Sequence, residues 1–450
     1  MAEVGVVSEP PRYFSINVDW ESAPGVATPE FRATWALLSI RIGSQAITAV
    51  EDSEGAYRRS VHTSAYPLAE WIAFNWWSLK AELRPSALPV PVWKWSNVTN
   101  QEWLRRHNVR GAGAGMPWPD LTFVSEGNAT RAVWHSGPGL AGQPVTFLSN
   151  GEAYLRTSHY IDELTHFVDL VVDRLQEAKV YDTPLAKEWL ALRATDDDEA
   201  AFACAAARLG LDPYSMSEEA QENLISISDR LDPLLMDEFL DSADPEHLGV
   251  ALGWLQQARR RAASLTITES AEAAPNWRNY WTGHDAPVDN IPWKRGYATA
   301  RELRDILGLE PTAHLAMGGL VRETRQPGRS AGLEGFTQLL PNDQLVLVLP
   351  SGKRLGTAVR FAQARSLGLV LASGRNEHLL DPVSTDLSKE SRAFAAELLA
   401  PAAGIAEYLS NLPAVTDAAF DAVAARFKTS TWVIRLQYEN QILHSDQIGI

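Results

Sequence analysis

The chain has 450 residues and a formal net charge of −16 at pH 7, and its 45% hydrophobic and 21% charged residues are typical of a globular protein with about two to four domains. The acidic excess argues against broad non-specific binding to nucleic acid or anionic lipid, although a local basic patch would override it. The single cysteine, Cys204, excludes an internal disulfide and a cysteine-rich zinc site, and so favours a reducing compartment.

The first residues, Met1 to Arg12, contain acidic residues and two prolines where a signal peptide needs a basic region and an apolar core. No stretch approaches the roughly 18 apolar residues that cross a bilayer. We therefore expect a cytoplasmic protein without a membrane partner.

Residues 1–149 are predicted to form a tryptophan-rich domain of strands and helices. The segments Tyr13–Trp20 and Trp35–Ile42 have the residue pattern of β-strands. Between Tyr66 and Lys80 the apolar residues recur at helical spacing, and Pro67 suits a first helical turn. The glycine-rich run Gly111–Pro119 is predicted to be a loop rather than a phosphate-binding turn, because its prolines prevent the helix that such a turn requires.

Ten of the sixteen tryptophans lie before residue 136. Several of them alternate with basic residues: Trp93, Trp95, Trp103, Trp118 and Trp134. Two interpretations follow: a stacking platform for a ligand or a single-stranded nucleic acid, or a tryptophan-rich core with a polar rim.

Residues 150–268 are predicted to form a helical domain. Its segment Asp162–His166 differs by one letter from the zinc motif His-Glu-x-x-His, but the apolar residues around it indicate a packing helix. The helical segment Asp197–Tyr214, followed by a further helix, has the order of a helix-turn-helix. From Asp212 to Glu246 there are eleven acidic residues and one basic residue, which argues against DNA recognition and favours an acidic face for a basic protein partner, or plain solvation.

Residues 269–291 are predicted to be a linker, after which residues 292–450 form a further α+β domain. A helix is expected over Tyr297–Leu309, strands over Phe336–Leu340 and Gln344–Leu349, and a helix from Gly356 to Ser373. Leu387–Pro401 is expected to form an amphipathic helix that ends at its proline.

The order Glu-x-x-x-Phe-Ala-Ala-Glu-Leu-Leu-x-Pro, which begins at Glu390, resembles the second metal-site helix of the ImmA/IrrE family of zinc metallopeptidases. The resemblance covers roughly residues 294 to 443. It implies a zincin-like domain with a small sheet packed by helices, and it places the family's third zinc ligand at Glu390.

The first metal helix of that family reads approximately Arg-Phe-x-x-Ala-His-Glu-Leu-Gly-His, and the corresponding segment here is Arg360–Leu369. Arg365 and Leu369 stand at the two histidine positions, and Ser366 stands at the position of the general-base glutamate. Arginine repels a cation, leucine has no lone pair and serine is a poor base, so the motif is degenerate and no zinc or other cofactor is expected.

A buried Glu390 beside an altered metal site needs a partner. We hypothesise that Arg365 and Glu390 form an ion pair across that site. The alternative is that Arg365 points outward and Glu390 caps its helix.

Three functions remain open from the sequence. The preferred one is an ImmA/IrrE-like pseudopeptidase that binds a protein partner, such as a helix-turn-helix regulator, in stress, mobile-element or phage-related regulation. The second is an active zinc metallo-endopeptidase that cleaves a repressor-like protein. The third is a nucleic-acid-binding module in the N-terminal domain.

Overall fold

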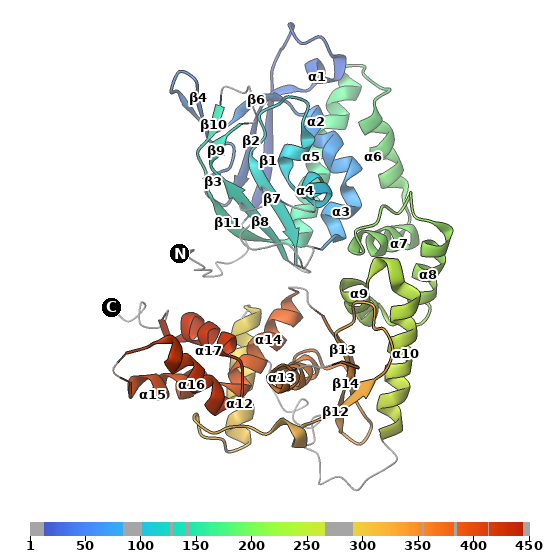
Figure 1. The fold of residues 1–450 in the computed structure, drawn as a ribbon. Coiled ribbons are helices and arrows are strands. Elements are labelled where there is room, and N and C mark those ends of the chain that lie inside the picture. Colours follow the sequence, from blue (N-terminus) through green and yellow to red (C-terminus); the bar gives the residue numbers. More distant parts are fainter. Residues whose placement is uncertain are drawn as a thin grey trace. The chain divides into compact units, whose positions relative to one another are not determined.

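The computed structural model describes residues 13–83, 101–126, 129–139, 145–265, 291–352, 355–381, 385–412 and 414–443. The chain combines helices with several small sheets and forms two compact units, Met1–Ser217 and Glu218–Ile450 (Figure 1). The expected mixture of α and β structure is therefore present. Within the described residues, no helix is both long enough and apolar enough to span a membrane.

In its described residues, the first unit is built from three antiparallel sheets and a set of helices. One sheet has the order β1-β2-β3 with β6 also on β2, the second β5-β4-β10-β9 and the third β11-β8-β7. The strands are β1 (Phe14–Trp20), β2 (Trp35–Ile42), β3 (Gln45–Ala46), β4 (Val50–Asp52), β5 (Tyr57–Arg58), β6 (Val61–Ser64), β7 (Asp120–Ser125), β8 (Ala129–His135), β9 (Gly137–Pro138), β10 (Val145–Phe147) and β11 (Gly151–Arg156). The helices are α1 (Pro29–Ala33), α2 (Tyr66–Phe74), α3 (Trp76–Ala81), α4 (Gln101–His107), the 3-10 helix η2 (Val109–Ala112), α5 (Thr157–Glu177), α6 (Pro184–Ala194) and α7 (Asp197–Arg208).

The tryptophans of the first unit form a core. Trp103, Trp118 and Trp134 are at most 1% exposed, so they do not provide a stacking surface. Trp93 and Trp95 lie outside the described residues. The interpretation as a tryptophan-rich core is therefore correct for the three rings that can be placed.

The predicted helical domain, residues 150–268, is divided between the two units. Helix α5 buries Tyr160, Leu164 and Phe167 in the core of the first unit, and α7 packs on α3 there. The helices α8 and α10 belong to the second unit, where α10 packs on a sheet. Each of these helices belongs to the unit in which a sheet or another helix covers its apolar face. The predicted helix-turn-helix segment is thus divided, with α7 in the first unit and α8 in the second.

Among the residues that can be placed, the second unit contains one mixed sheet of order β12-β14-β13-β15, in which β12 and β14 are parallel and the other neighbours antiparallel. The sheet lies between α10 and α13 (Figure 1). The strands are β12 (Val321–Gln326), β13 (Gly335–Leu339), β14 (Leu345–Pro350) and β15 (Glu377–Leu380). The helices are α8 (Glu218–Ser228), α9 (Pro233–Ser242), η3 (Pro245–His247), α10 (Leu248–Ser264), α12 (Pro292–Ile306), η5 (Met317–Gly319), α13 (Gly356–Ser373), α14 (Asp386–Leu399), α15 (Ala402–Ser410), α16 (Asp417–Phe427), α17 (Thr431–Gln437) and the π-helix η6 (Tyr438–Leu443).

Helix α14 packs against both α12 and α13, and glycines make the close approach possible. A Cβ on Gly296 of α12 would lie 2.2 Å from the backbone oxygen of Glu390, and a Cβ on Gly368 of α13 would lie 2.7 Å from the Phe394 ring. Both distances are too short for real contacts. The two glycines therefore set the spacing of these three helices.

Gly296→Ala is expected to destabilise the second unit by about 1–3 kcal/mol, because α12 must move away from the α14 backbone. The matched control is Gly253→Ala in α10, where an added Cβ meets nothing within 4 Å and a stabilisation of about 0.5–1 kcal/mol is expected. Urea unfolding monitored by circular dichroism would test both. Equal effects of the two substitutions would contradict the close approach.

The first unit contains a buried carboxylate, Glu82, that contacts the side chains of Arg106 and His107. Arg106 donates to it from Nε at 2.8 Å, and His107 Nε2 lies 3.1 Å from its Oε2. Burial raises the pKa of Glu82, but the hydrogen bonds from His107 and Arg106 outweigh this and lower it from 4.5 to about 2. A carboxyl with a lowered pKa stabilises the fold above its unfolded pKa, and this stabilisation is lost as the pH falls through the folded value.

We therefore expect the ionised Glu82 to contribute roughly 3 kcal/mol to the free energy of unfolding at neutral pH. This contribution should decrease as the pH falls from about 4.5 to about 2. Glu82→Gln should be destabilised at pH 7, and its difference from the wild type should shrink over this pH range. Urea unfolding at several pH values measures it. The exposed Glu54→Gln is the control, and a pH-independent difference for Glu82→Gln would refute the expectation.

Candidate functional site

Helix α13 carries the positions that resemble the first metal helix, and it is buried without interruption from Ala362 to Leu371. It is enclosed because it lies between the sheet and α14. Leu369 is 1% exposed and belongs to the core of the unit. The Ser366 hydroxyl donates to the carbonyl of Ala362 at 2.9 Å. Leu369 therefore contributes to core packing, and the Ser366 hydroxyl is bound within its own helix.

Arg365 occupies the third position and points into the protein. Its Nη2 donates to the carbonyl of Asp381 at 3.1 Å and to the Ser388 hydroxyl at 3.3 Å, whereas its buried Nε has no partner among the described residues. Burial lowers the pKa of Arg365 to about 10, and the nearby Arg392 acts in the same direction. Burial also raises the pKa of Asp381, although both guanidinium groups oppose that rise.

Glu390 is paired with a residue that the sequence analysis did not consider. Arg295 of α12 donates to its Oε2 from Nε at 3.0 Å and from Nη2 at 2.6 Å. Burial raises the pKa of Glu390, and Arg295 opposes the rise. The hypothesised Arg365–Glu390 ion pair is therefore wrong. The capping alternative is wrong as well, because the Thr385 side chain caps α14.

These four positions do not fit a zinc ion. Zinc requires neutral imidazoles, thiolates or free carboxylates as ligands. Here Arg365 has a positive charge, and Glu390 is bound by the Arg295 guanidinium. The Leu369 side chain is packed in the core, and the Ser366 hydroxyl is bonded to a carbonyl of its own helix. No step of a metal-dependent hydrolysis can be assigned to these side chains.

The structure also contains a chain of hydrogen bonds that the sequence analysis missed. The carboxylate of Glu238 on α9 lies 2.8 Å from Nδ1 of the buried His378 and accepts from the Leu379 backbone N–H at 2.7 Å. His378 Nε2 lies 2.6 Å from the Ser373 hydroxyl. In the sequence, Glu238 is one of eleven neighbouring acids and nothing distinguishes it from them.

The order Ser373, His378, Glu238 has the spacing of a nucleophile, base and orienting carboxylate. However, the Ser373 oxygen is hydrogen-bonded to the carbonyl of Leu369 and to the N–H of Arg375. A cavity of about 420 Å³ lies nearby, but neither Ser373 nor His378 lines it. Its lining residues are Asp232, Gln338, Leu339, Pro341, Arg375, Asn376 and Glu377. The arrangement therefore ties α9 to the edge strand β15 and satisfies the outward N–H of Leu379.

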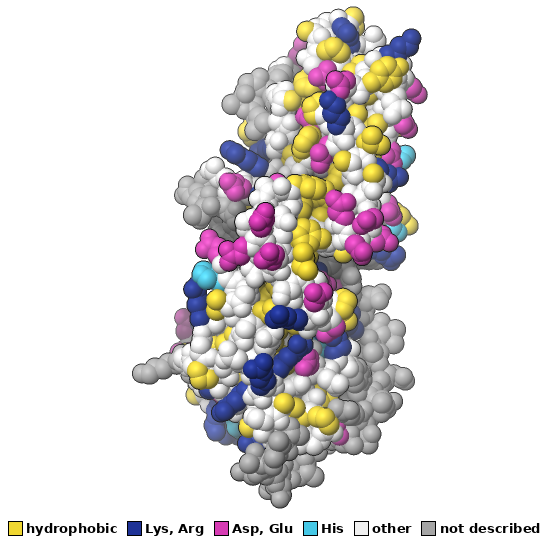
Figure 2. All heavy atoms as spheres, turned by 90° about the vertical axis from the view of Figure 1, so that its right-hand side faces the viewer, with side chains coloured by type: hydrophobic (Ala, Val, Ile, Leu, Met, Phe, Trp, Pro, Cys, Tyr) yellow, Lys and Arg dark blue, Asp and Glu magenta, His cyan; other side chains and the backbone are white. Residues whose placement is uncertain are grey.

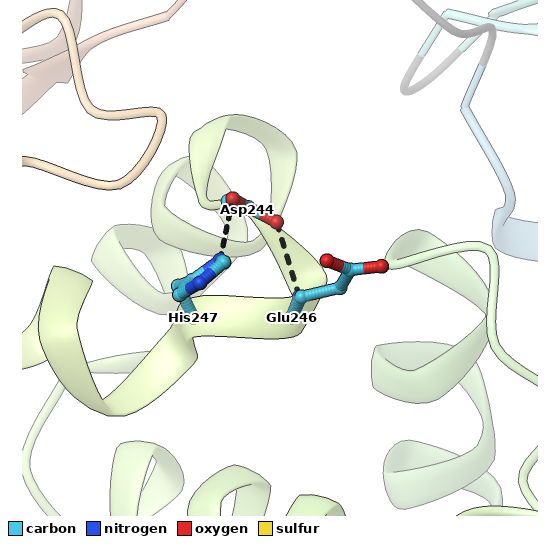
Figure 3. Close-up of side chains that lie close together, drawn as sticks. All are labelled: Asp244, Glu246 and His247. Atoms are coloured by element: carbon cyan, nitrogen blue, oxygen red, sulfur yellow. Dashed lines mark hydrogen bonds and ion pairs between the residues drawn. The ribbon is translucent and has the colours of Figure 1, made fainter.

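Asp244, Glu246 and His247 form a cluster of side chains with metal-ligand chemistry (Figure 3). Asp244 accepts from the Glu246 backbone at 3.1 Å, and its other carboxylate oxygen lies 2.8 Å from His247 Nδ1. The guanidinium of Arg329 lies 3.7 Å from Asp244 and 3.3 Å from His247 Nδ1. A cation already neutralises the carboxylate, so the cluster is explained as the cap of η3.

The acids of the segment Asp212–Glu246 differ in their exposure and pairing. Glu238 is buried, and Asp232 and Asp244 pair with Arg375 and Arg329. The exposed acids of this segment are Asp212, Glu218, Glu219, Glu222, Asp229, Asp232 and Glu246. Figure 2 shows acidic side chains on the face that includes α8, with basic side chains gathered elsewhere on the same view.

Comparison with known protein families finds no family that matches this chain, and comparison with curated proteins finds no match either. The resemblance to ImmA/IrrE peptidases therefore depends on the residues of α13 and α14 themselves.

Double-mutant cycles on alanine substitutions should distinguish the two partners of Glu390. We expect a coupling of at least about 1 kcal/mol between Arg295 and Glu390, and no more than about 0.5 kcal/mol between Arg365 and Glu390. The free energies of unfolding of the single and double variants in urea provide the measurement. The opposite order of couplings would support the ion pair between Arg365 and Glu390.

Proposed function

We propose that the second unit is a degenerate ImmA/IrrE-type peptidase domain that binds a protein partner without cleaving it. The proposal rests on the residues of α13 that align with the family's first metal helix. The three catalytic positions hold Arg365, Ser366 and Leu369, and all three side chains are buried and held by contacts within the unit. A charged, a hydroxyl and an aliphatic side chain cannot together activate a water molecule on zinc.

The order of elements also supports the proposal. The first three strands of the small mixed sheet are followed by α13 and then by α14, which is the order of sheet, helix and Glu390 helix that the resemblance implies; the last strand, β15, lies between the two helices in the sequence. Helices α13 and α14 pack closely where Gly368 meets Phe394. The two helices that resemble the family's metal helices are therefore neighbours.

The proposed partner is a regulatory protein, with a helix-turn-helix regulator as the class that the resemblance implies, and the proposed location is the cytoplasm. The exposed carboxylates on and around α8 suit a basic protein surface. The buried Trp103, Trp118 and Trp134 remove the main support for a nucleic-acid module in the first unit.

Metal analysis of the full-length chain should find far less than one zinc per chain. A reconstructed variant with Arg365→His, Ser366→Glu and Leu369→His, plus Arg295→Gln to release Glu390, should bind close to one zinc. Glu390→Ala in that background should weaken zinc binding by about tenfold or more, because a ligand is lost. Elemental analysis and zinc titration measure these effects, and circular dichroism confirms folding.

Stoichiometric zinc in the wild type, lost on Glu390→Ala, would instead support an active metallopeptidase. A reconstructed variant that folds but binds no zinc would contradict the alignment of α13 with the metal helix. The binding role has its own readout: a partner recovered with the full-length chain from native lysate should have its intact mass, and a shortened partner would contradict a role without cleavage.

A further inference from the structure

Three basic side chains lie near His314 in the second unit. Arg360 comes from the first half of α13, Arg426 from the last turn of α16, and Lys428 follows α16 directly. We call these four residues the His314 cluster. Neither the sequence analysis nor the proposed function assigns them a role.

Backbone contacts hold the cluster together. Arg360 donates from Nε to the carbonyl of Lys428 at 3.1 Å and from Nη2 to the carbonyl of Leu315 at 3.0 Å, and so links the end of α16 to the residue after His314. A Cβ on Gly404 of α15 would lie 2.2 Å from the carbonyl oxygen of Pro311. The loop of His314 is thus packed against α15 and the end of α16.

The cluster has a positive charge that no carboxylate compensates within the described residues. None of Arg360, Arg426 and Lys428 forms an ion pair there, in a chain with a net charge of −16. The Arg426 guanidinium lies over the Tyr408 ring, 5.8 Å from its centroid. Burial lowers the pKa of His314, and the three positive neighbours lower it further.

The end of α16 explains only part of this charge. Its last carbonyls carry about half a negative charge and accept bonds from Arg360, which satisfies the helix C-terminus. Two exposed cations and the histidine remain. The Nε2 atom of His314 is buried and has no hydrogen-bond partner among the described residues.

We propose that the His314 cluster binds a phosphate dianion, either free or as a monoester. Arginine and lysine offer only donors, and a histidine with Nε2 protonated adds one more, so the matching ligand is an acceptor with two negative charges. The ligand is a small one, because the acidic surface elsewhere disfavours a long polyanion. The ligand supplies the counter-charge that the described residues lack.

The test is a titration of the full-length chain, with histidines isotopically labelled, with inorganic phosphate at constant ionic strength. The His314 resonance, assigned with His314→Gln, should shift to saturation, and the pKa of His314 should rise because the dianion reverses the local field. The double variant Arg426→Glu/Lys428→Glu should weaken phosphate binding by at least about tenfold.

The chain offers a matched control for the charge reversal. Lys179, like Lys428, is an exposed lysine with a positive φ just after a helix, with φ values of 62° and 52° respectively. Lys179→Glu should change phosphate affinity by less than about twofold, since Lys179 is not part of the His314 cluster. If the double variant does not fold, Lys428→Asn removes one charge and keeps a residue suited to this backbone, and it should still weaken binding.

O-phosphoserine provides a second arm: binding as tight as that of inorganic phosphate indicates a monoester ligand, and much weaker binding indicates free phosphate. Either result supports the site. The proposal is overturned if the His314 resonance does not respond, or if chloride at equal ionic strength produces the same response as phosphate. It is also overturned if the charge reversals leave the affinity unchanged.

Discussion

The second unit depends on the close approach of α14 to α12 and α13, because this contact decides which charged groups meet. With Gly296 against the Glu390 backbone, α12 is near enough for Arg295 to bind Glu390 with two donors. On the other side of α14, Arg365 reaches Ser388 and the carbonyl of Asp381. Backbone spacing thus separates the two residues that were expected to pair. Glu390 binds Arg295 of α12, whereas Arg365 binds Ser388 of α14.

Much of the fold followed from local patterns in the sequence. The helix Gly356–Ser373 has the bounds that were expected, and the strands β1, β2, β13 and β14 lie where alternation or apolar runs placed them. The helix expected over 66–80 is two helices, α2 and α3, that meet at Asn75. The tertiary assignments were less reliable, because no local signal shows that α7 and α8 belong to different units.

The candidate site shows the same division between local and long-range information. The residue types at positions 365, 366 and 369 sufficed to argue against zinc chemistry, since that argument needs only their donor atoms. The partner of Glu390 could not be found in this way, because Arg295 is 95 residues away and basic residues are common. The Glu238–His378 contact spans 140 residues and has no motif at all. Sequence reasoning thus identified what the site lacks, and only the structure identified its contacts.

Single substitutions toward metal ligands at positions 365 and 369 would disturb the packing around α13. Replacing Arg365 by histidine alone would remove the donor to Ser388 and to the Asp381 carbonyl, and it would leave a buried acid with less compensating charge. Leaving buried polar groups without partners costs about 1–3 kcal/mol each. A histidine in place of Leu369 would put an imidazole in the apolar core. Arg365 and Leu369 both support the packing of this unit, so neither can be exchanged for a metal ligand without a cost in stability.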